Sequence, residues 1–363
     1  MRTVTRELCI VLLTIAAACT GCHLFAGKVP PLPRDIDSVK TTTEDAAAAS
    51  SDESIRAAVE KAHAVLWKGI EGHAGHRSCF TCHNHGVPVL AFATARTKGF
   101  VVPDKDFAEL IEFSTAYFDS YRERFLRGRG PGPLSLGGAT DTTGWGLFAF
   151  ELAGKKPDST TDAMVEYTLQ KDQDRDHWTT WGPARPPAEG SAFMPTALAI
   201  RGLLAYGPPE KQERIAKRVE AARAWLIRTP AQDSEDRVYR VLGLQAAGAS
   251  PEEIRKAAED IVRMQRADGG WGQTVSMASD AYATGSALTA LHTGGGMPVT
   301  DPVYRRGVAY LLRTQLDDGS WVVHSRSFPV QPYYESGFPH GRNQFISSAA
   351  TAWAATALAL AIP

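Results

Sequence analysis

The sequence predicts an all-α fold in which about six outer and six inner helices form a single α/α toroid. Apolar residues recur at helical spacing from about residue 52 to the end, and no run of alternating strand residues interrupts them. Amphipathic segments alternate with segments that are apolar all round, and six such pairs are enough to close a double ring. We therefore expect one folded domain over residues 52–363.

The chain begins with the features of an export signal. Arg2 and Arg6 precede an apolar run over residues 8–18, which is too short to span a bilayer and ends in small residues. This pattern predicts a lipoprotein-type signal peptide over residues 1–18.

The segment after the apolar run predicts a lipid anchor and a tether. Residues 15–19, IAAAC, resemble the lipobox of bacterial lipoproteins, in which Cys19 becomes the acylated first residue. Cys19, Cys22 and His23 also form Cys-x-x-Cys-His, but we favour lipidation because the apolar run ends there. Residues 19–51 suit a flexible tether. We expect a membrane-anchored lipoprotein of the bacterial cell envelope that faces the periplasm or the exterior.

The charge pattern argues against one class of partner. The net charge is -1, the pI is near 6.8, and no basic stripe is visible. Nucleic acid is therefore not an expected partner.

The helix pairs follow one another along the whole domain. The first members are amphipathic and charged, which predicts outer helices over residues 54–70, 105–126, 160–171, 210–228, 251–266 and 302–314. The second members are rich in Ala, Gly and Leu, which predicts buried inner helices over residues 87–97, 142–152, 192–206, 236–247, 281–291 and 347–361.

Two connectors between outer and inner helices share one pattern. Gln265 to Trp271 reads QRADGGW, Gln315 to Trp321 reads QLDDGSW, and residues 170–178 hold a degenerate third copy. The Gln amide can bridge free backbone groups at helix ends, Asp-Gly supplies a tight turn, and the Trp packs over the junction. The pattern predicts a structural clasp.

QRADGGWG and QLDDGSW resemble the QW repeats of the squalene-hopene cyclase and protein prenyltransferase β-subunit superfamily. The resemblance covers most of residues 52–363 and implies a toroid with a central apolar cavity, and hence a small apolar ligand. The chain lacks the second helical domain and the Asp-x-Asp-Asp acid motif of triterpene cyclases, and the Gly-Cys-Gly-Glu-Gln thioester of complement-type toroids. The resemblance thus implies the fold without its chemistry.

Residues 78–87, SCFTCHNHGV, contain the most specific chemical motif. Cys79, Cys82 and His83 have the spacing of a c-type haem attachment site, in which two thiols bond to the haem and the imidazole binds iron. We expect haem c, and three nearby histidines could supply a second iron ligand: His73, His76 and His85. The alternatives are a zinc or other metal site and a disulfide or inert pair.

Acidic residues precede several inner helices at what we expect to be the same rim. Asp280, followed by Tyr282, is either an N-cap or a catalytic acid at the cavity mouth. Asp141 and Asp236 occupy equivalent positions. The toroid therefore predicts that these residues share a rim with His83.

The last connector, residues 322–343, is the longest, and loops of this length within compact domains are often functional. Within it, Glu335 and His340 are candidates for acid-base catalysis.

These features predict an anchored toroid that binds haem c and serves electron transfer to a redox partner protein or redox chemistry on a small apolar ligand. One alternative is a non-redox enzyme of terpene cyclase or lyase type, in which Cys79, Cys82 and His83 are structural or bind zinc. A second is a non-enzymatic scaffold for a lipid or peptide.

Overall fold

The computed structural model describes residues 51–132, 139–180, 185–329 and 332–363. These residues form 13 α-helices, α2 to α14, and no β-strand, which confirms the all-α prediction. The predicted signal peptide, the predicted lipidation site Cys19 and the predicted tether up to residue 50 lie outside the described residues. Among the helices described, none is both long and apolar enough to cross a membrane.

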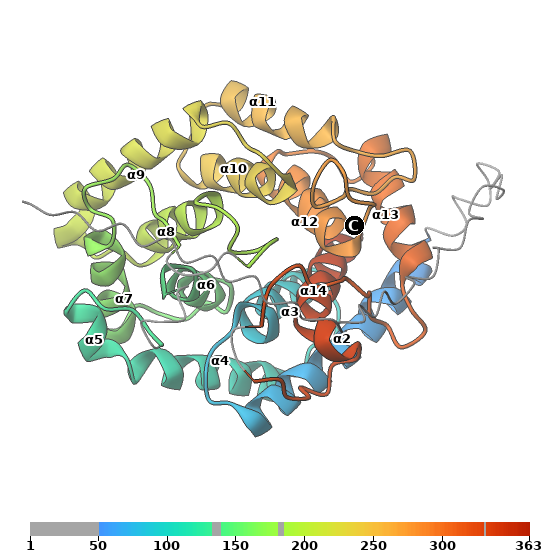
Figure 1. Cartoon of the computed structure of the whole chain (residues 1–363), viewed down its shortest axis with the longest axis horizontal. Coiled ribbons are helices and arrows are strands. Elements are labelled where there is room, and N and C mark those ends of the chain that lie inside the picture. Colours follow the sequence, from blue (N-terminus) through green and yellow to red (C-terminus); the bar gives the residue numbers. More distant parts are fainter. Residues whose placement is uncertain (1–50, 133–138, 181–184, 330–331) are drawn as a thin grey trace, which may run out of the picture. The chain divides into compact units, whose positions relative to one another are not determined.

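The helices form two concentric rings (Figure 1). The inner ring consists of α3 (Val87–Thr97), α6 (Ala139–Leu152), α8 (Phe193–Tyr206), α10 (Ser234–Ala246), α12 (Ala281–Thr289) and α14 (Gln344–Leu360). The outer ring consists of α2 (Asp52–His76), α4 (Asp104–Asp119), α5 (Arg122–Leu126), α7 (Ser159–Gln170), α9 (Gln212–Arg228), α11 (Pro251–Val262) and α13 (Pro302–Thr314). The six predicted pairs are all present, although the predicted helix over residues 105–126 is divided into α4 and α5.

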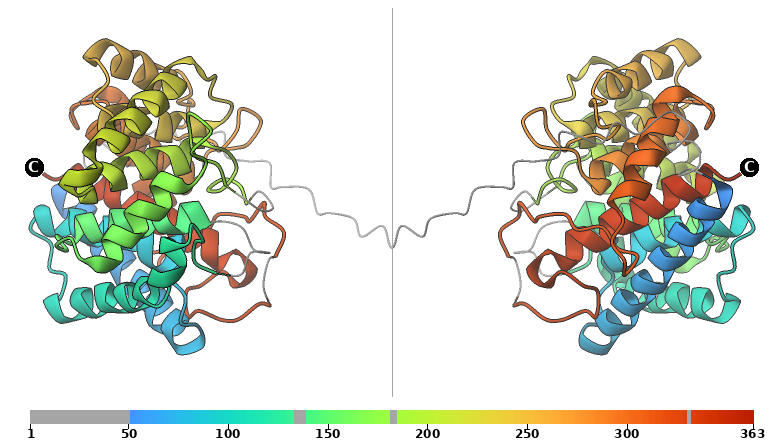
Figure 2. Two further views of the ribbon diagram at one scale, coloured as in Figure 1. Left: turned by 90° about the vertical axis from the view of Figure 1, so that its left-hand side faces the viewer. Right: turned by 90° about the vertical axis from the view of Figure 1, so that its right-hand side faces the viewer.

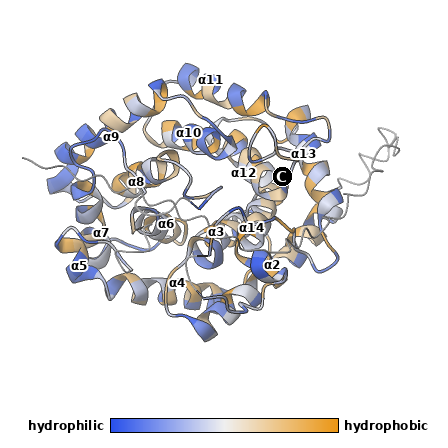
Figure 3. Ribbon diagram, in the orientation of Figure 1, coloured by the Kyte–Doolittle hydropathy of each residue, from blue (hydrophilic) through white to orange (hydrophobic). Residues whose placement is uncertain are grey.

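Burial separates the two rings as the sequence pattern predicts. In α14 every residue from Ser347 to Leu360 is buried, because small residues let α12 and α3 pack closely on either side. The outer helices carry hydrophilic residues on their solvent side (Figure 3). In side view, the red connector that leads into α14 lies at one end of the barrel (Figure 2).

The Trp of each predicted clasp is buried and makes the same two hydrogen bonds. Its indole N–H donates to a carbonyl of the preceding outer helix, and its backbone N–H donates to a Thr hydroxyl of the following inner helix. The donor-to-acceptor distances are 2.8 to 3.1 Å. For Trp178, Trp271 and Trp321 in turn, the indole acceptors are the carbonyls of Thr168, Ile261 and Leu311. The backbone acceptors, in the same order, are the hydroxyls of Thr196, Thr284 and Thr351. These bonds confirm the predicted structural role.

The Gln of each well-matched clasp joins successive outer helices. The Gln265 side chain donates to the Val303 carbonyl at the start of α13, at 2.8 Å. The Gln315 side chain donates to the Ala58 carbonyl in α2, also at 2.8 Å. The second bond closes the outer ring, because it joins the last repeat to the first helix.

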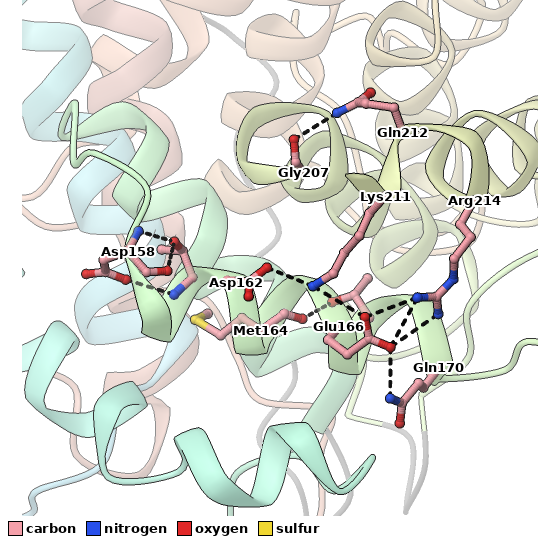
Figure 4. A network of polar contacts seen from close by, with 11 residues as sticks. Asp158, Asp162, Met164, Glu166, Gln170, Gly207, Lys211, Gln212 and Arg214 are labelled. Carbon is pink, nitrogen blue, oxygen red and sulfur yellow. Dashed lines mark hydrogen bonds and ion pairs between the residues drawn. The ribbon is translucent and has the colours of Figure 1, made fainter. Parts of the chain in front are cut away.

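Charged side chains link α7 to the start of α9 (Figure 4). Lys211 Nζ lies 2.7 Å from an Asp162 oxygen and 3.3 Å from a Glu166 oxygen, and Arg214 Nη1 lies 3.1 Å from Glu166. Ion pairs near the surface stabilise a fold by about 0–1 kcal/mol each. The core and the clasps therefore contribute more to the ring than this network does.

Gly285 marks the closest approach of α12 and α14. A Cβ atom at this position would lie 2.5 Å from the backbone carbon of Trp353, so Gly285→Ala forces the two helices apart. We expect the free energy of unfolding, measured by urea denaturation, to fall by about 1–3 kcal/mol.

The matched control is Gly75→Ala in α2, where a Cβ meets no atom within 4 Å. That variant should keep or slightly raise stability, since Ala favours helix over Gly. Equal effects at the two positions would contradict this account of the packing.

Candidate functional site

The Cys-x-x-Cys-His segment lies where it was predicted, between the first outer and first inner helices. Its last residues form a π-helical turn, Cys82–Gly86, that leads directly into α3. Cys82 and His83 line a cavity of about 360 Å³, which we call the rim cavity. Its volume is within the usual range for small-molecule sites.

The wall of the rim cavity comes from four parts of the chain. These are the Cys82 turn, the loop over residues 185–189, the start of α12 and the last connector with α14. The lining residues include Cys82, His83, Arg185, Glu189, Tyr282, Arg342, Phe345, Ile346 and Ala349. The last connector, which is the longest one, thus forms part of the wall of this cavity.

A second cavity of about 170 Å³, the inner cavity, lies between the inner helices. Its wall includes Leu90, Phe148, Tyr239, Leu242 and Trp353. A larger hollow of about 950 Å³ runs along α3, α4 and the end of α6, and it contains none of the predicted site residues.

Asp141, in the first turn of α6, is the acid whose environment is most unusual. It is 2% exposed, and neither carboxyl oxygen has a hydrogen-bond partner among the described residues. Burial raises its pKa well above the ordinary value, and the charge of Glu189 raises it further, while Arg185 opposes the shift. The neutral carboxylic acid is therefore favoured.

The charge of Asp141 reaches residues in the walls of both cavities. It acts on Cys82, in the wall of the rim cavity, and on Tyr239, in the wall of the inner cavity. Asp141 itself is not among the residues that line either cavity.

Glu235 is a second buried acid, and the sequence analysis did not find it. One of its oxygens accepts a hydrogen bond from the Tyr282 hydroxyl at 3.0 Å, and the other has no partner in the described residues. Burial, and then the charge of Asp233, raise its pKa well above the ordinary value. The only available signal was its place beside Asp236 in the first turn of an inner helix.

Asp280 and Asp236 lie at the starts of inner helices, as predicted. Asp280 is the N-cap of α12, where it accepts from the Ala283 N–H at 2.9 Å and from the Gln273 side chain at 2.8 Å. Asp236 accepts from the Gln232 N–H at 2.7 Å. For Asp280 the capping role therefore accounts for both oxygens.

Glu335 and His340 are not among the residues that line the rim cavity or the inner cavity. Glu335 is exposed and accepts a hydrogen bond from Tyr333. His340 has a left-handed backbone with φ of 82°, and its Nε2 lies 2.7 Å from the Ser320 hydroxyl. The structure thus brings neither acid-base candidate to Asp141.

The two motif cysteines have different surroundings, which bears on the haem prediction. Cys82 lines the rim cavity, whereas Cys79 does not. The sulfur of Cys79 lies 3.9 Å from His73 Nε2. Burial raises the pKa of Cys82 to about 12, so its thiol is favoured over the thiolate. A covalent haem needs both thiols at one face of the porphyrin, and this arrangement does not fit that need.

Of the proposed second iron ligands, His73 has both ring nitrogens occupied, whereas His85 keeps a buried Nε2 that has no partner among the described residues. His73 is buried, with Nδ1 2.6 Å from the Tyr334 hydroxyl and Nε2 2.8 Å from the Cys79 carbonyl. His85 Nδ1 accepts from the Thr81 N–H at 3.0 Å, and His76 Nδ1 lies 2.8 Å from its own helix backbone. For zinc, the described part of the chain places no three His, Cys, Asp or Glu side chains around one point. Haem and zinc stay predictions.

Comparison with known proteins identifies the same fold. Residues 202–361 match the squalene-hopene cyclase C-terminal domain. The squalene-hopene cyclase of Bradyrhizobium diazoefficiens is 34% identical over 110 residues, which cover 25% of this chain and 15% of that protein. The probable squalene-hopene cyclase of Sinorhizobium fredii is 33% identical over 122 residues, 28% of this chain and 18% of that protein. The chain thus matches less than a fifth of the length of these relatives.

Two solved structures share the architecture at low sequence identity. The type II terpene cyclase MstE from Scytonema, at 15% identity, covers 86% of this chain and 99% of its own with a TM-score of 0.55. A possible member of the GH105 family from Salmonella enterica, at 12% identity, covers 85% of this chain and 94% of its own with a TM-score of 0.52. The chain therefore has an α/α toroid fold like that of these solved structures, and its residues 202–361 match the squalene-hopene cyclase C-terminal domain.

Proposed function

We propose that this protein is a terpene cyclase-like enzyme that uses Asp141 to protonate a carbon–carbon double bond of a small apolar ligand. The observation that carries the proposal is the unpartnered, buried carboxyl group of Asp141, whose charge acts on Cys82 and Tyr239 in the walls of the two cavities. Solved structures of the Scytonema enzyme hold geranylgeranyl dihydroxybenzoate as substrate and merosterolic acid A as product, which supports a prenyl-type ligand.

The chemistry follows from a neutral acid in an apolar site. The Asp141 proton bonds to one alkene carbon through the π electron pair, and the other carbon becomes a cation. A second double bond of the ligand attacks this cation and closes a ring, and a neighbouring carbon finally loses a proton to the carboxylate or to water. Burial disfavours the charged form of Asp141 and so favours the protonated acid that can donate to an alkene.

The cavity walls suit a reaction that passes through positive charge. Aromatic rings at Phe345, Tyr239 and Trp353 line the two spaces, and electron-rich ring faces attract cations. The enzyme therefore needs no charged group in contact with the intermediate.

The test is to incubate the purified protein in D₂O with farnesol, geranylgeraniol and their carboxylic acid counterparts, and to analyse products by gas chromatography and mass spectrometry. The expected product is a cyclised or rearranged isomer that carries deuterium taken from the solvent through Asp141. Unchanged starting material from all of these compounds would overturn the proposal.

Covalent haem c in a redox protein remains a second candidate, supported by the motif and by the unpartnered Nε2 of His83 in the described part of the chain. If this candidate is right, protein exported alongside a haem-attachment system shows a Soret band and a mass increase that survives denaturation. Colourless protein of unchanged mass would exclude it. Mass analysis of the N-terminal peptide tests the predicted lipid on Cys19 and the envelope location.

A further inference from the structure

We infer that the ligand has two different ends, and that its outer end is an anionic oxygen group, such as a carboxylate, held at the mouth of the rim cavity by Arg342, Arg185 and His83. This inference rests on the proposed function, since it assumes that the other end reaches Asp141. It names the substrate class as prenyl acids rather than plain hydrocarbons.

The charges of the cavity wall favour an anion. Glu189 is the one acidic residue among those that line the rim cavity, and it already accepts a hydrogen bond from Arg185 Nε at 2.5 Å. Arg342 lines the same cavity and forms no ion pair with any described residue. The wall therefore keeps one uncompensated positive charge.

Arg342 is exposed and packs beside one aromatic ring. Its guanidinium lies 5.4 Å from the centre of the Tyr333 ring, and Tyr333 itself donates a hydrogen bond to Glu335. A planar guanidinium can bind a carboxylate through two parallel hydrogen bonds. The role of Glu335 would then be to position Tyr333, and through it Arg342.

His83 supplies a further polar atom in the same wall. Its Nε2 is buried and has no partner in the described residues, while its ring packs 4.8 Å from that of Phe345. A buried imidazole nitrogen without a partner is costly, and a ligand oxygen that reaches it removes the cost.

The remainder of the wall is apolar. Phe345, Ile346 and Ala349 follow one another along the first turns of α14, and Pro186 and Pro187 face the same space. An oxygen head group at the arginines therefore leaves an apolar chain as the part that lies against this apolar wall.

Binding can be measured without turnover by using Asp141→Asn protein. Intrinsic tryptophan fluorescence or calorimetry would compare farnesoic acid, farnesol and farnesene, three probes with similar chains and different ends. We expect the acid to bind about 5- to 10-fold more tightly than the alcohol, and the hydrocarbon to bind most weakly.

Arg342→Gln is expected to remove the preference for the acid over the alcohol. The control is Arg305→Gln on the outer helix α13, an exposed arginine that does not line the cavity, and it should leave the preference unchanged. Circular dichroism confirms that each variant is folded. Equal affinity for acid and alcohol, or an unchanged preference in Arg342→Gln, overturns the inference.

The two proposals fail in different ways. If the acid binds through Arg342 but wild-type protein converts none of the compounds, the proposed function is wrong and the anion site stands. If wild-type protein cyclises hydrocarbon and acid equally well, the function stands and the anion site is wrong.

Discussion

Asp141→Asn is expected to lower turnover by about 10²- to 10⁴-fold, because the amide has the shape of the acid but no transferable proton. The measurement is the rate of product formation from the best substrate of the panel, together with the deuterium content of the product. Binding of the same substrate should change little, because the substitution conserves volume.

Asp106→Asn on the outer helix α4 is the matched control, and it should keep full activity. In wild-type protein, turnover should fall as the pH rises through the raised pKa of Asp141, since only the neutral acid donates a proton. Full activity of Asp141→Asn would remove Asp141 from the mechanism.

The same pKa shift makes a prediction about stability. Asp141 has a raised pKa in the folded protein, so the folded state keeps its proton at pH values where the unfolded chain has lost it. The stability that this proton adds is fully present below the pKa that Asp141 has in the unfolded chain. It is lost as the pH rises through the pKa that Asp141 has in the folded protein. The free energy of unfolding of Asp141→Asn should therefore improve relative to wild type as the pH rises above the ordinary pKa of an aspartate, and an unchanged difference would contradict the shift.

Trp321→Ala is expected to reduce the free energy of unfolding by about 3–5 kcal/mol, the largest stability effect that we predict. Trp321 is 2% exposed and its indole N–H donates a hydrogen bond to the Leu311 carbonyl, so its loss leaves a cavity and one unpaired acceptor where the ring closes. Urea denaturation followed by circular dichroism measures the effect.

Phe328→Ala is the control for removal of an aromatic ring. Phe328 is 90% exposed, and its loss should change the free energy of unfolding by less than about 0.5 kcal/mol. A loss below 1 kcal/mol for Trp321→Ala would show that the clasp does not stabilise the ring.

Much of the fold was predictable because local sequence patterns specify its helices and its clasps. The switch between amphipathic and fully apolar segments located α13 and α14 closely, and the Gln-to-Trp spacing located two clasps. The spacing of Cys79, Cys82 and His83 also located one wall of the rim cavity, although the structure supports a lining role there better than a haem site.

The candidate site was less predictable because its residues meet only in three dimensions. Asp141 was one of several acids that precede inner helices in the sequence. No sequence pattern showed that, in the described part of the chain, Asp141 alone lacks partners for both carboxyl oxygens. Glu189 and Arg185 lie in a connector without helical pattern, and Tyr239 looks like an ordinary core residue of α10. Such roles depend on burial and on distant neighbours, which local spacing does not encode.

The bond from Gln315 to Ala58 has a consequence for how the chain can be cut and rejoined. Gln315 joins the last repeat to the first helix in the same way that Gln265 joins its repeat to the next outer helix. The two ends of the folded domain therefore meet at a junction that resembles this other junction of the barrel. A circular permutant that joins the ends through a short linker and opens in the exposed connector before α7 would keep every clasp. The order of the helices around the barrel, rather than the place where the chain starts, then specifies the fold.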